Sequence, residues 1–166
     1  MIYYLIASIL IAVAALFART KRAVLAAGIL FYAVQIAAAG LLLWGGLYDT
    51  TSAAFFTFDA LGTLFYLLLV VVSMYVFGHS EAYLQGEDLR SYRLYFALLM
   101  LLTTAIAGAY FANNLAVTWI FLEATTLCSA GIIYHRRTAQ ALEATWKYIF
   151  VCSVGIATAY LGILLL

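Results

Sequence analysis

Residues 115–134 read LAVTWIFLEATTLCSAGIIY, an apolar stretch with one charged side chain, Glu123. A helix that crosses the hydrocarbon core of a bilayer needs about 20 mostly apolar residues, and this stretch has that length. At a helical rise of about 1.5 Å per residue, Glu123 lies about 12 Å from Leu115, near the middle. A carboxylate at that depth costs roughly 2.5–3.5 kcal/mol on insertion scales, and such residues often mark ion or proton paths. The stretch therefore predicts a transmembrane helix that carries a functional site.

The composition places the whole chain among integral membrane proteins. Of its 166 residues, 68% are hydrophobic and 9% are charged, none is proline, and the mean hydropathy is +1.10. Too few polar residues remain to cover a water-soluble core. The net charge of +1 gives no indication of nucleic-acid binding. We therefore expect a polytopic all-α membrane protein whose surface contacts the lipid bilayer.

Six apolar segments account for most of the chain, and each is close to the length of a membrane-spanning helix. They cover residues 2–18, 22–44, 54–77, 92–112, 115–134 and 143–166. The connections are short, which favours antiparallel neighbours in one bundle, so we predict a single transmembrane domain over residues 1–166. Because no polar residue follows the final run LGILLL, we also expect this sequence to be part of a longer or split protein.

The basic residues predict the orientation in the membrane. The first, third and fifth connections carry Lys and Arg, whereas the second and fourth carry neither. The residues are Arg19, Lys21, Arg22, Arg90, Arg93, Arg136 and Arg137. Cytoplasmic loops are enriched in Lys and Arg, so we expect these connections in the cytoplasm and the N-terminus outside. The expected location is the inner, cytoplasmic membrane of the cell.

Three further ionisable residues join Glu123 as candidates for proton translocation, and each also has a purely structural explanation. Lys147 is about one turn inside the sixth span, where a lysine can extend to the membrane surface. Glu143 precedes it by four residues, the spacing of a helical ion pair. Asp59 lies near the outer end of the third span, where aspartate favours a helix N-terminus. The functional alternative is a polar line from the cytoplasm through Lys147 to Glu123.

The motifs around these residues resemble a known family. They are WIFLEATTLCS at 119–129, ALEATWKY at 141–148, SVGIATAYLG at 153–162 and FTFDALG at 56–62. Together they resemble the antiporter-like proton-translocating membrane subunits shared by respiratory complex I, Mrp-type sodium/proton antiporters and membrane-bound hydrogenases. The pattern is most similar to the F-type subunit of hydrogenase-4 and formate hydrogenlyase-like complexes.

The resemblance implies roles for two residues and partners for the chain. Glu123 matches the family's fifth-helix glutamate, and Lys147 matches the lysine that opens its sixth helix. In the family the glutamate couples to a lysine on a seventh helix, beyond the six segments of this sequence, and inverted repeats build the site jointly. Other membrane subunits and a cytoplasmic redox module are therefore the implied partners. Iron–sulfur clusters, and nickel–iron or flavin groups, are expected in those partners.

The chain itself has no motif for flavin, haem or iron–sulfur ligation and no Cys/His cluster, so we expect it to bind no cofactor or metal. The favoured hypothesis is a proton-translocating subunit, or its N-terminal portion, within an energy-converting redox complex. Such a chain would be a non-redox subunit of a larger oxidoreductase. Two alternatives stay open: a cation/proton antiporter subunit of the Mrp type, and a non-catalytic scaffold in which Glu123 only makes a hydrogen bond.

Overall fold

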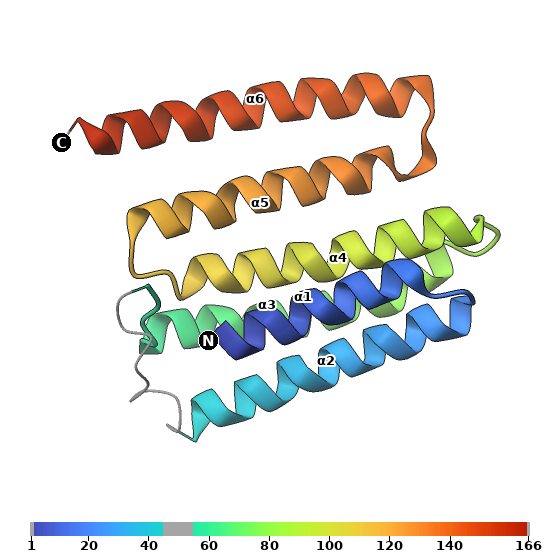
Figure 1. Ribbon diagram of the computed structural model, residues 1–166, viewed down its shortest axis with the longest axis horizontal. Helices are drawn as coiled ribbons and strands as arrows, with labels where there is room; N and C mark the ends of the chain where they lie inside the picture. The colour runs from blue at the N-terminus through green and yellow to red at the C-terminus, as the bar shows by residue number, and fades with distance from the viewer. Residues whose placement is uncertain (1, 45–54, 166) are drawn as a thin grey trace.

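The computed structural model describes residues 2–44 and 55–165, which form six α-helices and one 3₁₀ turn (Figure 1). The helices are α1 (Ile2–Phe17), α2 (Lys21–Leu43), α3 (Ala60–Tyr83), α4 (Leu89–Tyr110), α5 (Leu115–Ile133) and α6 (Ala139–Leu164). The 3₁₀ turn η1 (Tyr134–Arg136) follows α5 directly. The all-α fold predicted from the sequence is confirmed.

The described helices are also suited to a membrane. Five of them, α2 to α6, are long and apolar enough to cross it, judged by length and composition. The remaining helix, α1, has 16 residues. At about 1.5 Å per residue it extends about 24 Å, less than a hydrocarbon core of about 30 Å. The polytopic membrane class is therefore confirmed, with α1 as the shortest of six apolar helices.

The predicted third helix over 54–77 is wrong at both ends, because α3 begins and ends six residues later. The residues before α3 pair with the end of α4 instead of coiling. The Thr57 N–H donates to the Phe111 carbonyl at 2.9 Å, and the Asn113 N–H donates to the Phe55 carbonyl at 2.8 Å. At the other end the polar residues continue the helix, and the Ser80 hydroxyl donates to a carbonyl one turn earlier.

The predicted start of the sixth helix at residue 143 is also wrong. Thr138 is the N-cap of α6, and its Oγ1 accepts a hydrogen bond from the Ala141 N–H at 3.1 Å. The extra turn places Lys147 about 12 Å inside the helix, deeper than the single turn expected. All other helix ends agree with the predicted bounds within three residues.

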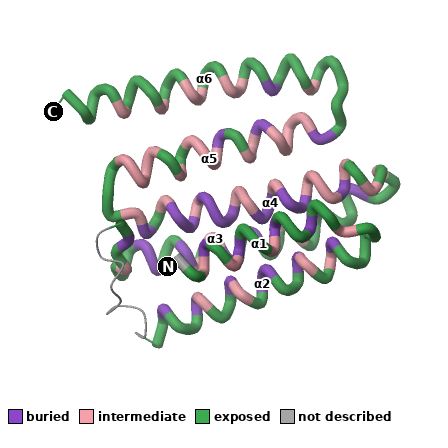
Figure 2. The backbone as a smooth tube through the Cα atoms, in the orientation of Figure 1, coloured by how far each residue is buried: buried purple, intermediate pink, exposed green. Residues whose placement is uncertain are grey.

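The tightly packed part of the molecule is α1 to α4, and α5 and α6 extend from it as successive layers (Figures 1 and 2). Ten residues of α4 are buried, whereas α6 has one, Thr145. The helices α4 and α5 approach closely at Gly108 and Gly131, where an added Cβ atom would meet Phe121 and Leu98 respectively. Within the described residues α6 contacts only α5 and η1. A broad face of α6 is therefore left uncovered by the described residues.

A buried polar cluster joins α1, α2 and α3. The Gln35 Oε1 atom accepts hydrogen bonds from the hydroxyls of Tyr4, at 2.5 Å, and Tyr66, at 2.7 Å. Nearby, the Tyr32 hydroxyl donates to the Ser73 carbonyl at 2.9 Å and again links α2 to α3. Interhelical hydrogen bonds in membrane proteins contribute about 0.6 kcal/mol each on average. These bonds fix the register of the three helices against one another.

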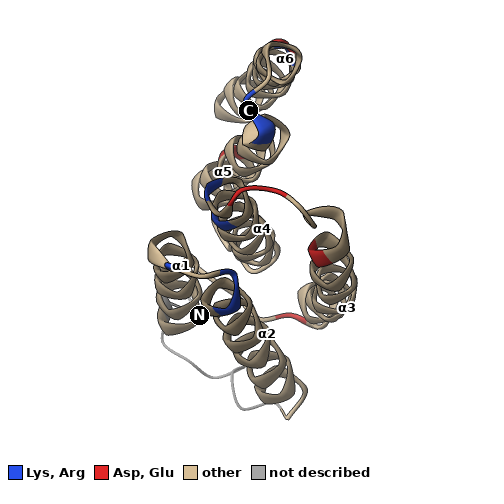
Figure 3. Cartoon of the chain, turned by 90° about the vertical axis from the view of Figure 1, so that its right-hand side faces the viewer, with Lys and Arg blue, Asp and Glu red and all other residues tan. Residues whose placement is uncertain are grey.

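The basic connections lie together at one end of the bundle. Figure 3 looks onto this end, where Lys and Arg gather. The Arg93 side chain donates to the Ala18 carbonyl at 3.0 Å, and the Lys21 ammonium donates to the Glu87 carbonyl at 2.8 Å. The Arg136 Nε atom pairs with Glu87 Oε1 at 3.1 Å. That this end faces the cytoplasm stays a prediction from the charge pattern.

Candidate functional site

Glu123 of α5 makes a hydrogen bond to α6. The Ser153 hydroxyl donates to the Glu123 Oε1 atom at 2.8 Å, and both side chains are half-buried. Glu123 lies about 12 Å from the start of α5, and Ser153 lies about 17 Å from the end of α6. Because the two helices are antiparallel, both distances are measured from the same end of the bundle. The carboxylate and its partner therefore meet at mid-depth of the predicted membrane span.

Local signals in the sequence set the register that brings Glu123 to Ser153. Asn114 caps α5, and its Oδ1 atom accepts from the Ala116 N–H at 2.8 Å. At the opposite end, Arg137 has a left-handed backbone, with φ 52°, which ends η1 and lets the chain turn back. Thr138 then caps α6. The two caps and the tight turn leave little freedom for α6 to slide along α5.

Aromatic and apolar side chains surround the pair on the side of the α4–α5 connection. Trp119, one turn from Glu123, stacks on Tyr160 of α6 with ring centroids 5.0 Å apart. These two rings line a shallow groove of about 120 Å³ together with apolar residues such as Leu122 and Ile156. The Trp119 Nε1 atom is buried and has no hydrogen-bond partner among the described residues. The pair of Glu123 and Ser153 is thus a polar site with an apolar wall on one side.

The serine hydroxyl suits a carboxyl group that changes its charge. A hydroxyl group has one proton to donate and lone pairs that accept, whereas an ionised carboxylate only accepts. Ser153 can therefore donate to an ionised Glu123 and accept from a protonated one, with little movement of either side chain. The arrangement can hold a proton at Glu123 and release it without leaving a buried polar atom unpaired in either state.

Lys147 and Glu143 are not brought to Glu123 by the structure. The Lys147 ammonium pairs with Glu143 Oε1 at 2.5 Å, and the two side chains are 74% and 66% exposed. Lys147 is six positions before Ser153, which places the two about 120° apart around α6. Ser153 faces α5, and the exposed side chains of Lys147 and Glu143 lie on the part of α6 that α5 does not cover. This ion pair is the structural explanation that the four-residue spacing predicts.

Asp59 is the N-cap of α3. Its Oδ1 atom accepts from the Gly62 N–H at 2.9 Å, and its carbonyl accepts from the Thr63 hydroxyl at 2.8 Å. An added Cβ atom at Gly62 would meet the Asp59 carboxylate and the backbone of Tyr110, so glycine allows this close approach. The cap satisfies N–H groups that a helix start otherwise leaves without partners.

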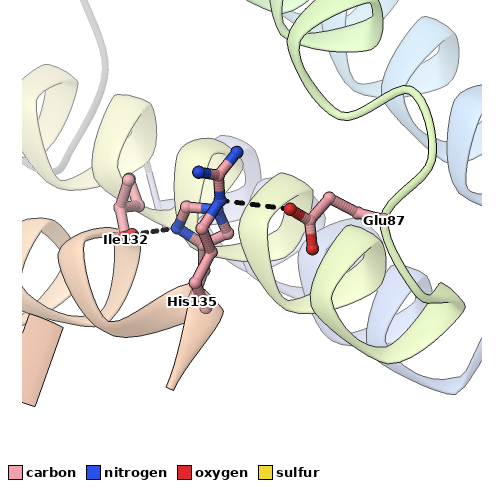
Figure 4. A network of polar contacts seen from close by, with 4 residues as sticks. Glu87, Ile132 and His135 are labelled. Carbon is pink, nitrogen blue, oxygen red and sulfur yellow. Dashed lines mark hydrogen bonds and ion pairs between the residues drawn. The ribbon is translucent and has the colours of Figure 1, made fainter. Parts of the chain in front are cut away.

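His135 lies in a connection between helices, where the sequence favours an inert surface histidine, but the structure buries it. It is 7% exposed in η1, and its Nδ1 atom lies 2.8 Å from the Ile132 carbonyl (Figure 4). The ring packs on Tyr95 with centroids 5.4 Å apart, beside the ion pair of Arg136 and Glu87. The burial results from η1 continuing α5 across the ends of α3 and α4. A histidine next to two arginines gives no signal of this in the sequence.

The chain is similar in sequence to a protein described as a hydrogenase-4 component F homolog, from Methylacidiphilum infernorum. The two are 30% identical over 115 residues, which is 66% of this chain and 24% of that protein. The chain therefore spans about a quarter of the length of this relative. No family model matches the chain, and no solved structure matches it. At the level of the broad family, the similarity supports the resemblance that the motifs around Glu123 carry.

Proposed function

We propose that this chain is a proton-translocating membrane subunit, or part of one, in an energy-converting redox complex related to membrane-bound hydrogenases. In this proposal Glu123 alternates between its protonated and ionised forms, and redox chemistry in other subunits drives the proton movement. The name of the relative, a hydrogenase-4 component, supports a redox complex over an independent cation/proton antiporter.

The observation that carries the proposal is the hydrogen bond between Ser153 and Glu123 at mid-depth of α5 and α6. A lone carboxyl group at this depth is costly, and intramembrane ionisable residues tend to line ion or proton paths. The hydroxyl partner serves both protonation states of Glu123. A scaffold could join α5 and α6 with apolar contacts alone and would not need the carboxyl group.

The proposal includes partner subunits on the open face of α6. Glu143 and Lys147 form an exposed ion pair about one and two turns inside α6, whose other residues carry no charge. Exposed charges at that depth are unfavourable in lipid, so we assign this face to contact with other membrane subunits. Those subunits would supply the remaining part of the proton path. Iron–sulfur clusters, with nickel–iron or flavin groups, would lie in the redox module and not in this chain.

The test is Glu123→Gln in the assembled complex, reconstituted in vesicles and supplied with its electron donor. Gln keeps the size and polarity of the side chain but cannot take up or release a proton. We expect electron transfer to lose most of its coupled proton transport, with more than a tenfold decrease in the initial rate of pumping. The matched control is Asp88→Asn, which removes an exposed carboxyl group before α4 that makes no side-chain cap hydrogen bond, and it should leave pumping unchanged.

Proton transport at the wild-type ratio of protons to electrons in Glu123→Gln would contradict the proposal. Transport that requires sodium ions and no electron donor would favour the antiporter alternative. Assembly of the variant complex is checked by its elution volume, so that a lost subunit is not mistaken for a lost proton path.

A further inference from the structure

Two cavities follow one another along the seam between α2 and α3. The first, of about 370 Å³, lies at the basic end of the bundle, and its lining includes Lys21, Arg22, Leu25, Glu81, Leu84 and Tyr92. The second, of about 320 Å³, is lined by residues that include Ile29, Tyr32, Ile36, Met74, Phe77 and Gly78. Leu25 and Ile29 are one helical turn apart on α2, and Gly78 and Glu81 are about one turn apart on α3. The two cavities therefore adjoin along the same seam.

We propose that this seam binds one anionic phospholipid. Its phosphodiester group lies between Lys21 and Arg22 at the basic end, and one acyl chain follows the apolar cavity along α2 to Ile36. The site is separate from Glu123, which lies between α5 and α6.

The basic cavity matches a single negative charge. Lys21 is held in place, because its ammonium donates to the Glu87 carbonyl at 2.8 Å and lies 5.3 Å from the centre of the Tyr92 ring. Arg22 is next to it on the first turn of α2, and Glu81 contributes one carboxylate to the same cavity. The lining therefore carries a net charge of +1, from two cations and one anion. The phosphodiester of an anionic headgroup such as phosphatidylglycerol balances this charge, whereas phosphatidylethanolamine, whose ammonium group offsets its own phosphodiester, leaves it unbalanced. Basic pockets between helices are typical sites for lipid headgroups.

The apolar cavity has a firmly packed floor. The Tyr32 ring lies 5.1 Å from the Phe77 ring, and its hydroxyl donates to the Ser73 carbonyl. Phe77 fills the space beside Gly28, where an added Cβ atom would collide with its ring. The walls by contrast are open, since Ile29 of α2 is 67% and Met74 of α3 is 45% exposed. A rigid floor between two exposed apolar walls fits an extended acyl chain.

The length of the seam agrees with one leaflet of a bilayer. From Leu25 to Ile36, α2 rises about 17 Å. Half of the hydrocarbon core is about 15 Å. A lipid whose headgroup occupies the basic cavity therefore has its acyl chain beside the second cavity over most of its length, and the chain ends near the middle of the membrane.

Gly78 allows the acyl chain to be excluded without disturbing the fold. An added Cβ atom at Gly78 would meet no other atom within 4 Å, so a leucine there points into the open cavity. An added Cβ atom at Gly155 would also meet no other atom within 4 Å, and Gly155 lies on α6 and not on the seam between α2 and α3. Gly155→Leu is therefore a matched control. For the headgroup, the double change Lys21→Gln with Arg22→Gln removes both cations. Arg137→Gln removes a cation at the same end of the bundle but outside the cavity.

The experiment uses the full chain purified from an equal mixture of phosphatidylglycerol and phosphatidylethanolamine. Tightly retained lipids are counted by native mass spectrometry. We expect the wild-type chain to retain phosphatidylglycerol about fivefold over phosphatidylethanolamine, the preference that one net charge near a membrane surface supplies. The double charge variant should lose this preference, and Gly78→Leu should retain less than half of the phosphatidylglycerol. Both controls should match the wild-type chain.

Equal retention of the two lipids by the wild-type chain would overturn the proposal. So would an unchanged preference in the double charge variant or unchanged retention in Gly78→Leu. Displacement of the lipid by an excess of inorganic phosphate would show a site for a free anion and would also overturn it. Arg22→Gln alone is the second variant if the double change does not yield folded protein, and it should at least halve the preference. None of these outcomes depends on proton transport, so the site and the proposed function can fail independently.

Discussion

At the scale of single residues, the decisive contact is that of Glu123 with Ser153. The sequence alone places Glu123 at mid-depth, because its distance from both ends of an apolar stretch can be counted. It gives no reason to choose Ser153 as the partner over Lys147, which lies on the same helix. The choice depends on rotation around α6, where Ser153 faces α5 and Lys147 does not. Rotation of one helix against another is set by packing over the whole contact.

A first prediction concerns Ser153→Ala, which removes the hydrogen bond but leaves Glu123 in place. We expect proton transport to slow by about threefold to tenfold, less than in Glu123→Gln, because a carboxyl group without a partner can still bind a proton. The loss of stability should be about 0.6 kcal/mol, the average for a hydrogen bond between membrane helices. Thermal unfolding in detergent and the initial rate of proton uptake measure the two effects.

The matched control for this change is Thr158→Val. Among the described residues, the Thr158 hydroxyl bonds to the carbonyl groups of Val154 and Gly155, both within α6. Its removal should affect neither transport nor stability by a measurable amount. A larger decrease in the initial rate of proton uptake in Thr158→Val than in Ser153→Ala would contradict the role assigned to Ser153.

At the scale of elements, the helices themselves follow from hydropathy, but two of their ends do not. The segment 55–59 is apolar enough to continue a helix towards α2, yet it is extended because its backbone pairs with the end of α4. This pairing joins residues that are more than 50 positions apart in the chain, so no local pattern indicates it. The continuation of α3 beyond Phe77 is similarly hidden, because its polar residues resemble a loop.

A second prediction concerns Asp59 at the start of α3. Asp59→Ala should lower the free energy of unfolding by about 1 kcal/mol, the usual effect of losing an N-cap side chain. Asp59→Asn keeps an oxygen that accepts the Gly62 N–H and should restore most of that stability. Chemical unfolding in detergent micelles measures both variants, and proton transport should be unchanged in Asp59→Asn. A transport defect in Asp59→Asn at wild-type stability would instead give Asp59 a place in the proton path.

At the scale of the whole molecule, α1 to α4 form a bundle while α5 and α6 present large uncovered surfaces (Figure 2). The composition predicts the membrane class, and the charge pattern predicts which connections share an end. Neither the composition nor the charge pattern indicates that α6 has a single buried residue among those described. The apolar residues of a helix follow the same pattern whether the helix faces lipid or a neighbouring subunit. Glu143 and Lys147 are exposed in this chain. In the proposed complex, a partner subunit covers the face of α6 that carries them.

A third prediction tests this face by labelling. With Cys128 and Cys152 replaced by alanine, Lys147→Cys should react with a water-soluble maleimide at least tenfold more slowly in the assembled complex than in the purified chain. The control is Gln85→Cys in the connection between α3 and α4, which is exposed in the chain. Equal rates for Lys147→Cys in the two preparations would show that no partner covers this part of α6.

The central claim is that Glu123 gains and loses a proton during turnover, and infrared difference spectroscopy tests it most directly. Spectra of the assembled complex are recorded with and without its electron donor, in the wild-type protein and in Glu123→Gln. We predict a carboxyl C=O stretching band that changes with turnover in the wild-type complex, shifts slightly in Ser153→Ala and is missing in Glu123→Gln. A wild-type complex that pumps protons with no carboxyl band that depends on Glu123 would contradict the claim.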